Sequence, residues 1–148
     1  MRDDGSSDGR QTRRRFLAAT GTVVTASLSG CSTSLASGDD FDVGMTATAF
    51  DPPTVTVEVG DEVVWRNTSS RGHTVTAYEG TLPEGAEFFA SGGFEDEETA
   101  RNAYSNSLGG LIKGRETYSH TFEVAGEYEY LCIPHEQQGM VGTIVVEE

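Results

Sequence analysis

From residue 43 onward, apolar and polar residues alternate in short runs, as they do in β-strands that bury one face. The run TVTVEV (54–59) shows this best, because Val55, Val57 and Val59 fall on one face. Six further runs are rich in Val, Thr and aromatic residues, and turn material such as DPP, GD and TSSRG separates them. These runs cover residues 43–50, 62–67, 73–78, 115–124, 127–132 and 140–146. About seven to eight short antiparallel strands at this spacing predict an all-β sandwich.

Residues 79–114 interrupt the strand pattern. They hold two Gly pairs and an acidic cluster, and the segment DEETARNAYSN (96–106) predicts a short helix with acidic residues in its first turn. We expect residues 79–114 to form a long excursion on the surface of the sandwich.

The first 30 residues have the pattern of a targeting segment rather than of a fold. The stretch 16–30 is only weakly apolar and is shorter than the roughly 20 residues that span a membrane. The preceding TRRRFL (12–17) resembles a twin-arginine export signal, although the basic start of an ordinary secretory signal is the alternative.

The segment LSGC (28–31) resembles a lipobox, in which a Cys receives a lipid after cleavage. We therefore expect a signal peptide at 1–30, a lipidated flexible tether at 31–42 and a single folded domain at 43–148. Lipid on Cys31 would hold the exported domain at the outer face of the cell membrane without spanning it.

The net charge of −14 is unevenly distributed. Residues 32–148 carry five Lys or Arg against 21 Asp or Glu, a net charge of −16. Such a surface argues against nucleic acid as a partner, because nucleic-acid binding needs a basic footprint. The acidic residues are spread along the chain, which favours the solvated surface of a halophilic protein over an acidic docking face for a basic partner.

The run CIPHEQQGM (132–140) places a thiol, an imidazole and a thioether in one short loop stiffened by a Pro. Cys132, His135 and Met140 together suit copper, whose two oxidation states accept soft and borderline ligands. A second imidazole is missing from the loop, and only His73 and His120 remain. We favour His73, which follows a turn at a strand end, over His120, which lies in the middle of a strand.

The two cysteines, Cys31 and Cys132, offer a disulfide as an alternative. We favour lipidation of Cys31, which leaves Cys132 as the only thiol of the folded domain. A metal would protect that thiol in an oxidising compartment.

Residues 43–148 resemble small blue copper proteins of the plastocyanin class, and most of all the halocyanins of halophilic archaea. GHTV around His73, VEVGDEVVWRN, HTFEVAGEYEYLC and CIPHEQQGM carry the resemblance. It implies a Greek-key, cupredoxin-like sandwich with one type-1 copper, held by His73, Cys132, His135 and Met140.

The resemblance further implies a monomeric one-electron carrier in which His135 is the exit for the electron. Its partners would be a redox protein donor and acceptor, which we expect among membrane respiratory components. The chain departs from plant plastocyanins at two positions. Leu131 stands where those proteins have a Tyr before the Cys, and Thr74 stands where an Asn often follows the first His.

No nucleophile elbow or pair of catalytic carboxylates is recognisable, and four ligands would leave copper no open position for a substrate, so we do not expect an enzyme. Two other classes remain open. One is a storage or delivery module for copper or zinc, since zinc also accepts Cys and His ligands. The other is a metal-free adhesive or structural sandwich with an inert Cys132.

Overall fold

The computed structural model describes residues 40–148. The predictions for the signal peptide, for lipidation of Cys31 and for most of the tether lie outside these residues. Eleven elements follow one another along the described part of the chain. They are β1 (Val43–Met45), β2 (Phe50–Asp51), β3 (Thr54–Glu58), β4 (Glu62–Asn67), β5 (Thr76–Ala77), η1 (Glu79–Thr81), α2 (Glu97–Ser107), β6 (Thr117–Thr121), β7 (Gly126–Leu131), η2 (Ile133–Gln138) and β8 (Val141–Glu147).

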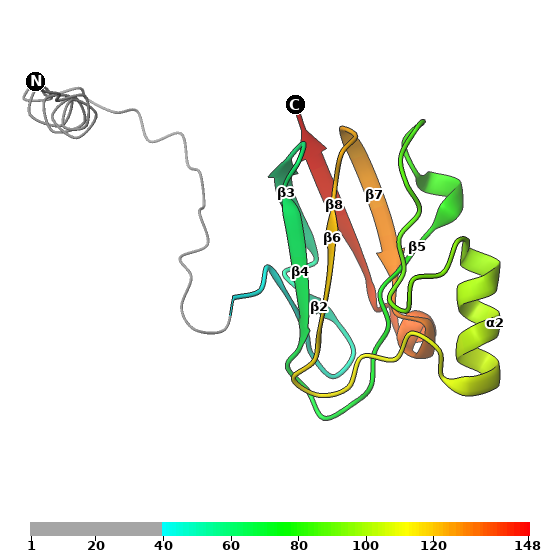
Figure 1. Ribbon diagram of the computed structural model, residues 1–148. Coiled ribbons are helices and arrows are strands. Elements are labelled where there is room, and N and C mark those ends of the chain that lie inside the picture. Colours follow the sequence, from blue (N-terminus) through cyan, green and yellow to red (C-terminus); the bar gives the residue numbers. More distant parts are fainter. Residues whose placement is uncertain (1–39) are drawn as a thin grey trace, which may run out of the picture. The chain divides into compact units, whose positions relative to one another are not determined.

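The eight strands form two four-stranded sheets, ordered β2-β1-β4-β6 and β3-β8-β7-β5 (Figure 1). The all-β sandwich is thereby confirmed. The expectation that all strands run antiparallel is wrong, because β1 pairs with β4 and β3 pairs with β8 in parallel. In each case the two strands are distant in the sequence, so their connection has room to return to the same end of the sheet.

Successive residues of a β-strand point to opposite faces of the sheet, and this explains which side chains enter the core. In β4 the buried positions are Val63, Trp65 and Asn67, and in β8 every second residue from Gly142 is buried. In β3, Val55 and Val57 pack against the core as expected. Val59 does not, because it follows the last residue of the strand and is 42% exposed.

Trp65 lies at the centre of an aromatic core. Its ring centroid lies 5.4–6.4 Å from those of four other rings, the range of favourable aromatic pairs. These rings belong to Phe89, Tyr118, Phe122 and Tyr130. They come from both sheets and from the 79–114 segment, so Trp65 ties all three together.

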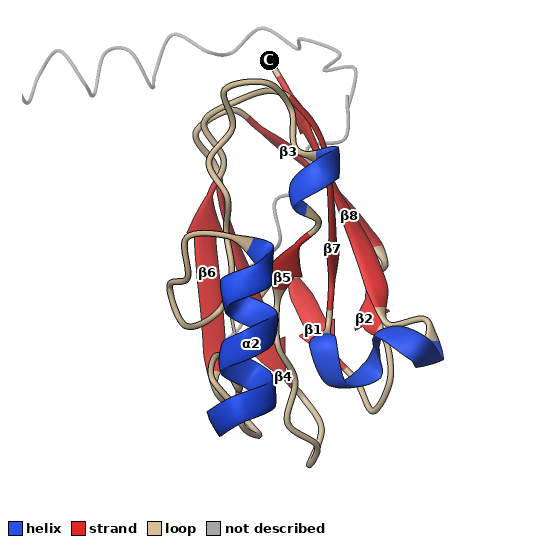
Figure 2. Ribbon diagram, turned by 90° about the vertical axis from the view of Figure 1, so that its right-hand side faces the viewer, coloured by secondary structure: helices blue, strands red, loops and turns tan. Residues whose placement is uncertain are grey.

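The 79–114 segment is only partly the surface excursion that the sequence predicts. The predicted helix is confirmed as α2, whose N-cap Asp96 accepts a hydrogen bond from the Thr99 N–H at 2.7 Å, and it packs beside β5 (Figure 2). Phe89, however, is buried in the core and its carbonyl accepts from the Ala77 N–H. Ile112 is also buried and pairs with His73. The segment thus completes both the core and one wall of the site described below.

A substitution at Gly142 can test how tightly this core is packed. A methyl group on Gly142 would lie 2.5 Å from the Tyr130 Cζ, and Tyr130 is held between Phe50 and Trp65 at ring distances of 4.6 and 5.4 Å. We expect Gly142→Ala to lower the free energy of unfolding by about 2 kcal/mol, measured by urea denaturation. Gly80→Ala is the control, because nothing lies within 4 Å of that position. Equal stability of the two variants would contradict this packing.

Candidate metal centre

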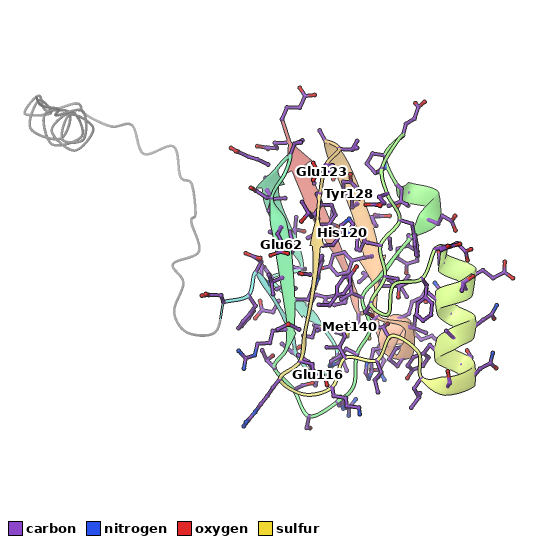
Figure 3. The ribbon with its side chains drawn as sticks, in the orientation of Figure 1. Glu62, Glu116, His120, Glu123, Tyr128 and Met140 are labelled. Atoms are coloured by element: carbon purple, nitrogen blue, oxygen red, sulfur yellow. The ribbon has the colours of Figure 1, made fainter. Side chains whose placement is uncertain are left out.

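The Cys132–Met140 loop lies at one end of the sandwich, where Met140 is seen far from Tyr128 and Glu123 (Figure 3). The loop is folded by backbone hydrogen bonds: the His135 N–H donates to the Cys132 carbonyl at 3.1 Å, and the Cys132 N–H donates to the Met140 carbonyl at 3.0 Å. Pro134 lies in the first turn of η2, and Gly139 ends this element at φ 83°, a conformation that favours glycine. These residues favour a compact loop whose two ends adjoin β7 and β8.

Three of the four candidate ligands converge at this end. His73 Nδ1 lies 3.2 Å from His135 Nδ1, and Cys132 Sγ lies 3.6 Å from the first and 3.4 Å from the second. Within residues 40–148 this is the one group of His, Cys and acidic side chains whose donor atoms gather closely enough to hold a metal ion. Bonds of about 2.0–2.3 Å from one ion to three surrounding N and S atoms place those atoms about 3.5 Å apart, so the set fits a metal.

Met140 and His120 occupy contrasting places. Met140 is completely buried at the end of the loop, and its N–H donates to the carbonyl of His135 at 3.2 Å. His120 lies on β6, where its ring stacks on Phe89 and meets Phe122 edge-on, both at 4.8 Å. The structure thus brings His73, and not His120, to Cys132 and His135.

Burial keeps the three donors uncharged. It lowers the pKa of His73 to about 4, with the neighbouring His135 as the second cause. It also lowers the pKa of His135 and raises the pKa of the Cys132 thiol. Neutral imidazoles are ready to bind a metal at pH 7, and a bound cation would stabilise the thiolate that burial otherwise disfavours.

A polar pair orients His73. The Ser69 hydroxyl donates to Asn67 Oδ1 at 2.9 Å and lies 2.9 Å from His73 Nε2. The hydroxyl proton has the Arg71 carbonyl at 3.3 Å as a second acceptor, so the oxygen is placed to accept from a protonated Nε2, the tautomer that leaves His73 Nδ1 free for a metal. Asn67 is itself buried and donates to the Ile112 carbonyl at 2.9 Å. The polar run NTSS (67–70) is the only sign of this pair in the sequence, and it is too general to predict the contact with His73.

Thr74 joins the two segments that supply the ligands. Its N–H donates to Cys132 Sγ at 3.4 Å, and its hydroxyl accepts from the Ile133 N–H at 2.8 Å. The position that departs from plant plastocyanins therefore still cross-links the two loops, through a hydroxyl in place of an amide.

Helix α2 is tied to the ligand loop through Glu136, the residue after His135. Arg101 donates to both carboxylate oxygens of Glu136, at 2.6 and 3.3 Å, and the Tyr78 hydroxyl donates to the same group at 3.0 Å. The Arg101 guanidinium is the main cause that lowers the pKa of Glu136. Glu97 lies one turn earlier in α2, and its Oε1 forms an ion pair with Arg101 Nη2 at 2.8 Å.

Comparison with known proteins agrees with this site. Residues 39–147 match the family model described as copper binding proteins of the plastocyanin/azurin family. A plastocyanin of Scenedesmus fuscus is 35% identical over 68% of this chain and 89% of its own length. A chloroplastic plastocyanin of Tetradesmus obliquus is 34% identical over 68% of this chain, which spans 60% of that relative.

Among solved structures, the Cu(I) form of an amicyanin variant is similar. It has a TM-score of 0.53 and 28% identity, and the match covers 76% of this chain and 87% of that one.

The Arg101–Glu136 pair is open to direct test. We expect Arg101→Gln to speed amide hydrogen exchange in residues 133–139, because the loop loses its two-pronged attachment to α2. Glu97→Gln is the control, since it weakens the other ion pair of Arg101 and leaves Arg101 and Tyr78 bound to Glu136. The effect of Arg101→Gln should be present above about pH 4.5 and vanish as acid protonates Glu136, because a carboxyl with a lowered folded-state pKa stabilises only while ionised. Unchanged exchange at pH 7 would contradict the attachment.

Proposed function

The chain belongs to the plastocyanin/azurin family of copper-binding proteins, and on this premise we propose that it is a one-electron carrier rather than an enzyme. The observation that carries the proposal is the convergence of His73 Nδ1, Cys132 Sγ and His135 Nδ1 at 3.2 to 3.6 Å from one another in a buried site. A buried thiol beside two neutral imidazoles is the ligand set that blue-copper sites use.

The proposed ligands are His73, Cys132, His135 and Met140, and the thioether of Met140 would be the weakest of the four. Copper bound there would supply reversible exchange of one electron between Cu(I) and Cu(II). The protein would supply a fixed frame, since Ser69 orients one imidazole and Thr74 links the two loops. Side chains held in this way change position little when the charge of the site changes, which favours fast electron exchange.

His135 is the proposed exit for the electron. Its exposed fraction is 9%, whereas His73, Cys132 and Met140 are completely buried. Val141, directly after the loop, is 43% exposed and offers an apolar contact beside it. A partner could approach His135 without disturbing the rest of the loop.

We further propose the halocyanin subtype and a place at the membrane. Supporting observations are the net charge of −16 on residues 32–148, the TRRRFL motif and the LSGC motif that ends at Cys31. None of the residues that the structure describes forms a helix long and apolar enough to cross a membrane. A lipid on Cys31 would hold the carrier beside membrane respiratory donors and acceptors, with the tether giving it reach.

Spectroscopy tests the copper site. We expect Cu(II) to give the protein an intense blue thiolate-to-copper band with small copper hyperfine splitting in the EPR spectrum, and reversible voltammetry. Cys132→Ser should abolish the band, whereas His120→Phe should keep it, because His120 lies outside the cluster. Met140→Leu should keep the band and shift the reduction potential. A colourless protein that takes up zinc instead would favour the storage or delivery module.

Lipidation has its own test. We expect the protein expressed in a host with twin-arginine export to sediment with membranes and to carry a mass increment of acyl groups on its N-terminal peptide. Cys31→Ala should release it from the membrane fraction. Loss of export on replacing Arg13 and Arg14 by Lys would support the twin-arginine route. A soluble wild-type protein with an unmodified Cys31 would contradict the anchor.

A further inference from the structure

The few basic residues of the domain are gathered at one end. Residues 40–148 hold five Lys or Arg, and Arg101 is engaged with Glu97 and Glu136. Three others are exposed, and we name them the basic face: Arg71, two residues before His73, and Lys113 and Arg115, just after Ile112. We propose that the basic face docks an acidic surface of a redox partner protein. The proposal rests on the proposed function and adds the chemistry of the partner.

The two segments that carry the basic face adjoin each other at the metal centre. The Arg115 N–H donates to the Asn67 carbonyl at 2.8 Å, and the His73 N–H donates to the Ile112 carbonyl at 3.1 Å. Glu116 is the one carboxylate within these segments, and its Oε2 accepts from the backbone N–H of Lys113 at 2.7 Å. Figure 3 shows Glu116 toward the same end as Met140, whereas Glu123 lies at the opposite end. The segment that carries Lys113 and Arg115 thus lies at the end of the sandwich that holds the metal centre.

Arg71 connects the basic face to the ligands. Its backbone N–H donates to Ser69 Oγ at 3.2 Å, and the same oxygen lies 2.9 Å from His73 Nε2. Arg71 is exposed, as are Lys113 and Arg115. A carboxylate that pairs with this face would bring the partner close to the proposed exit at His135.

Arg115 is held in an unfavourable backbone conformation. Its φ is 74°, in the left-handed region that favours glycine, within a turn closed by the Glu116 N–H on the Lys113 carbonyl. Arg115 lines an open cleft of about 550 Å³ together with Gly92, Leu111, Glu116 and Tyr118. The cleft gives an acidic side chain of a partner a place to enter.

The rest of the domain surface is acidic, and this makes the basic face selective for the orientation in which an acidic partner approaches. An acidic partner is repelled by most of the surface, so only an approach toward the basic face is attractive. This orients the encounter, because the attractive approach is also the one that faces the metal centre. An anionic membrane could use the same charges, but a lipid headgroup offers no redox group at His135, so a protein partner fits the position better.

The test uses hexacyanoferrate(III), an anionic one-electron oxidant, with the copper-loaded, reduced protein. One electron passes from the protein's copper to iron, which becomes iron(II), and the return of the blue band measures the rate. In spite of the net negative charge, we expect the rate to fall about tenfold as salt rises from about 0.05 to about 1 M, because salt screens the attraction to the basic face. The blue band at each salt concentration verifies that the site is intact.

Lys113→Gln/Arg115→Gln should remove most of this salt dependence and slow the reaction at low salt. The matched control is Thr54→Glu/Thr56→Glu, which changes the net charge equally at two exposed positions of β3 in the other sheet. This control should keep the wild-type salt dependence. Lys113→Glu repeats the test without touching the turn at Arg115, in case the double variant folds poorly.

Three results would overturn the inference. The wild-type rate could rise with salt, as the net charge alone would require, or the variant and the control could behave alike. The Lys113→Gln/Arg115→Gln variant could also lose sedimentation with phosphatidylglycerol vesicles while keeping its hexacyanoferrate kinetics, which would assign the charges to a membrane. Failure of the proposed function is distinguishable, because the wild-type protein would then show neither a blue band nor oxidation by a cationic cobalt(III) phenanthroline complex.

Discussion

The metal centre depends on one constraint: the fold brings three buried donor atoms from two distant segments to within 4.8 Å of one another. Burial removes charge from His73 and His135 and keeps Cys132 a thiol, so the donors do not repel one another without a metal. The sandwich holds both segments. The Cys132–Met140 loop is closed on β7 and β8, and the segment of His73 is fixed by its pairing with Ile112.

Hydrogen bonds convert this proximity into a defined geometry. The Asn67–Ser69 pair selects the His73 nitrogen that faces the cluster, and Thr74 joins the segment of His73 to that of Cys132. Around the loop, Arg101 of α2 reaches Glu136. The segment between β5 and β6 therefore supports the site on two sides, through Ile112 and through α2. Such support limits movement of the ligands when copper gains or loses an electron.

The strands, helix α2 and the candidate ligands could be predicted because each has a signal in a short stretch of sequence. The strands show alternating apolar residues, the helix has an acidic first turn, and CIPHEQQGM holds three of the four candidate ligands. The parallel pairings β1–β4 and β3–β8 were missed, since no local pattern states which distant strand is the neighbour. Gly pairs and an acidic cluster predict that the segment of Phe89 is a surface excursion, yet tertiary packing on Trp65 buries this ring. Ser69 and Arg101 were also missed, because their roles exist only after the chain has folded.

The central claim is a rigid site with two imidazoles and one thiolate that serves both oxidation states. X-ray absorption at the copper edge of the loaded protein, before and after reduction, tests it most directly. We expect two nitrogen ligands and one short sulfur ligand in both states, with bond lengths that agree within about 0.2 Å. Loss of the short sulfur ligand, or replacement of an imidazole on reduction, would contradict the claim.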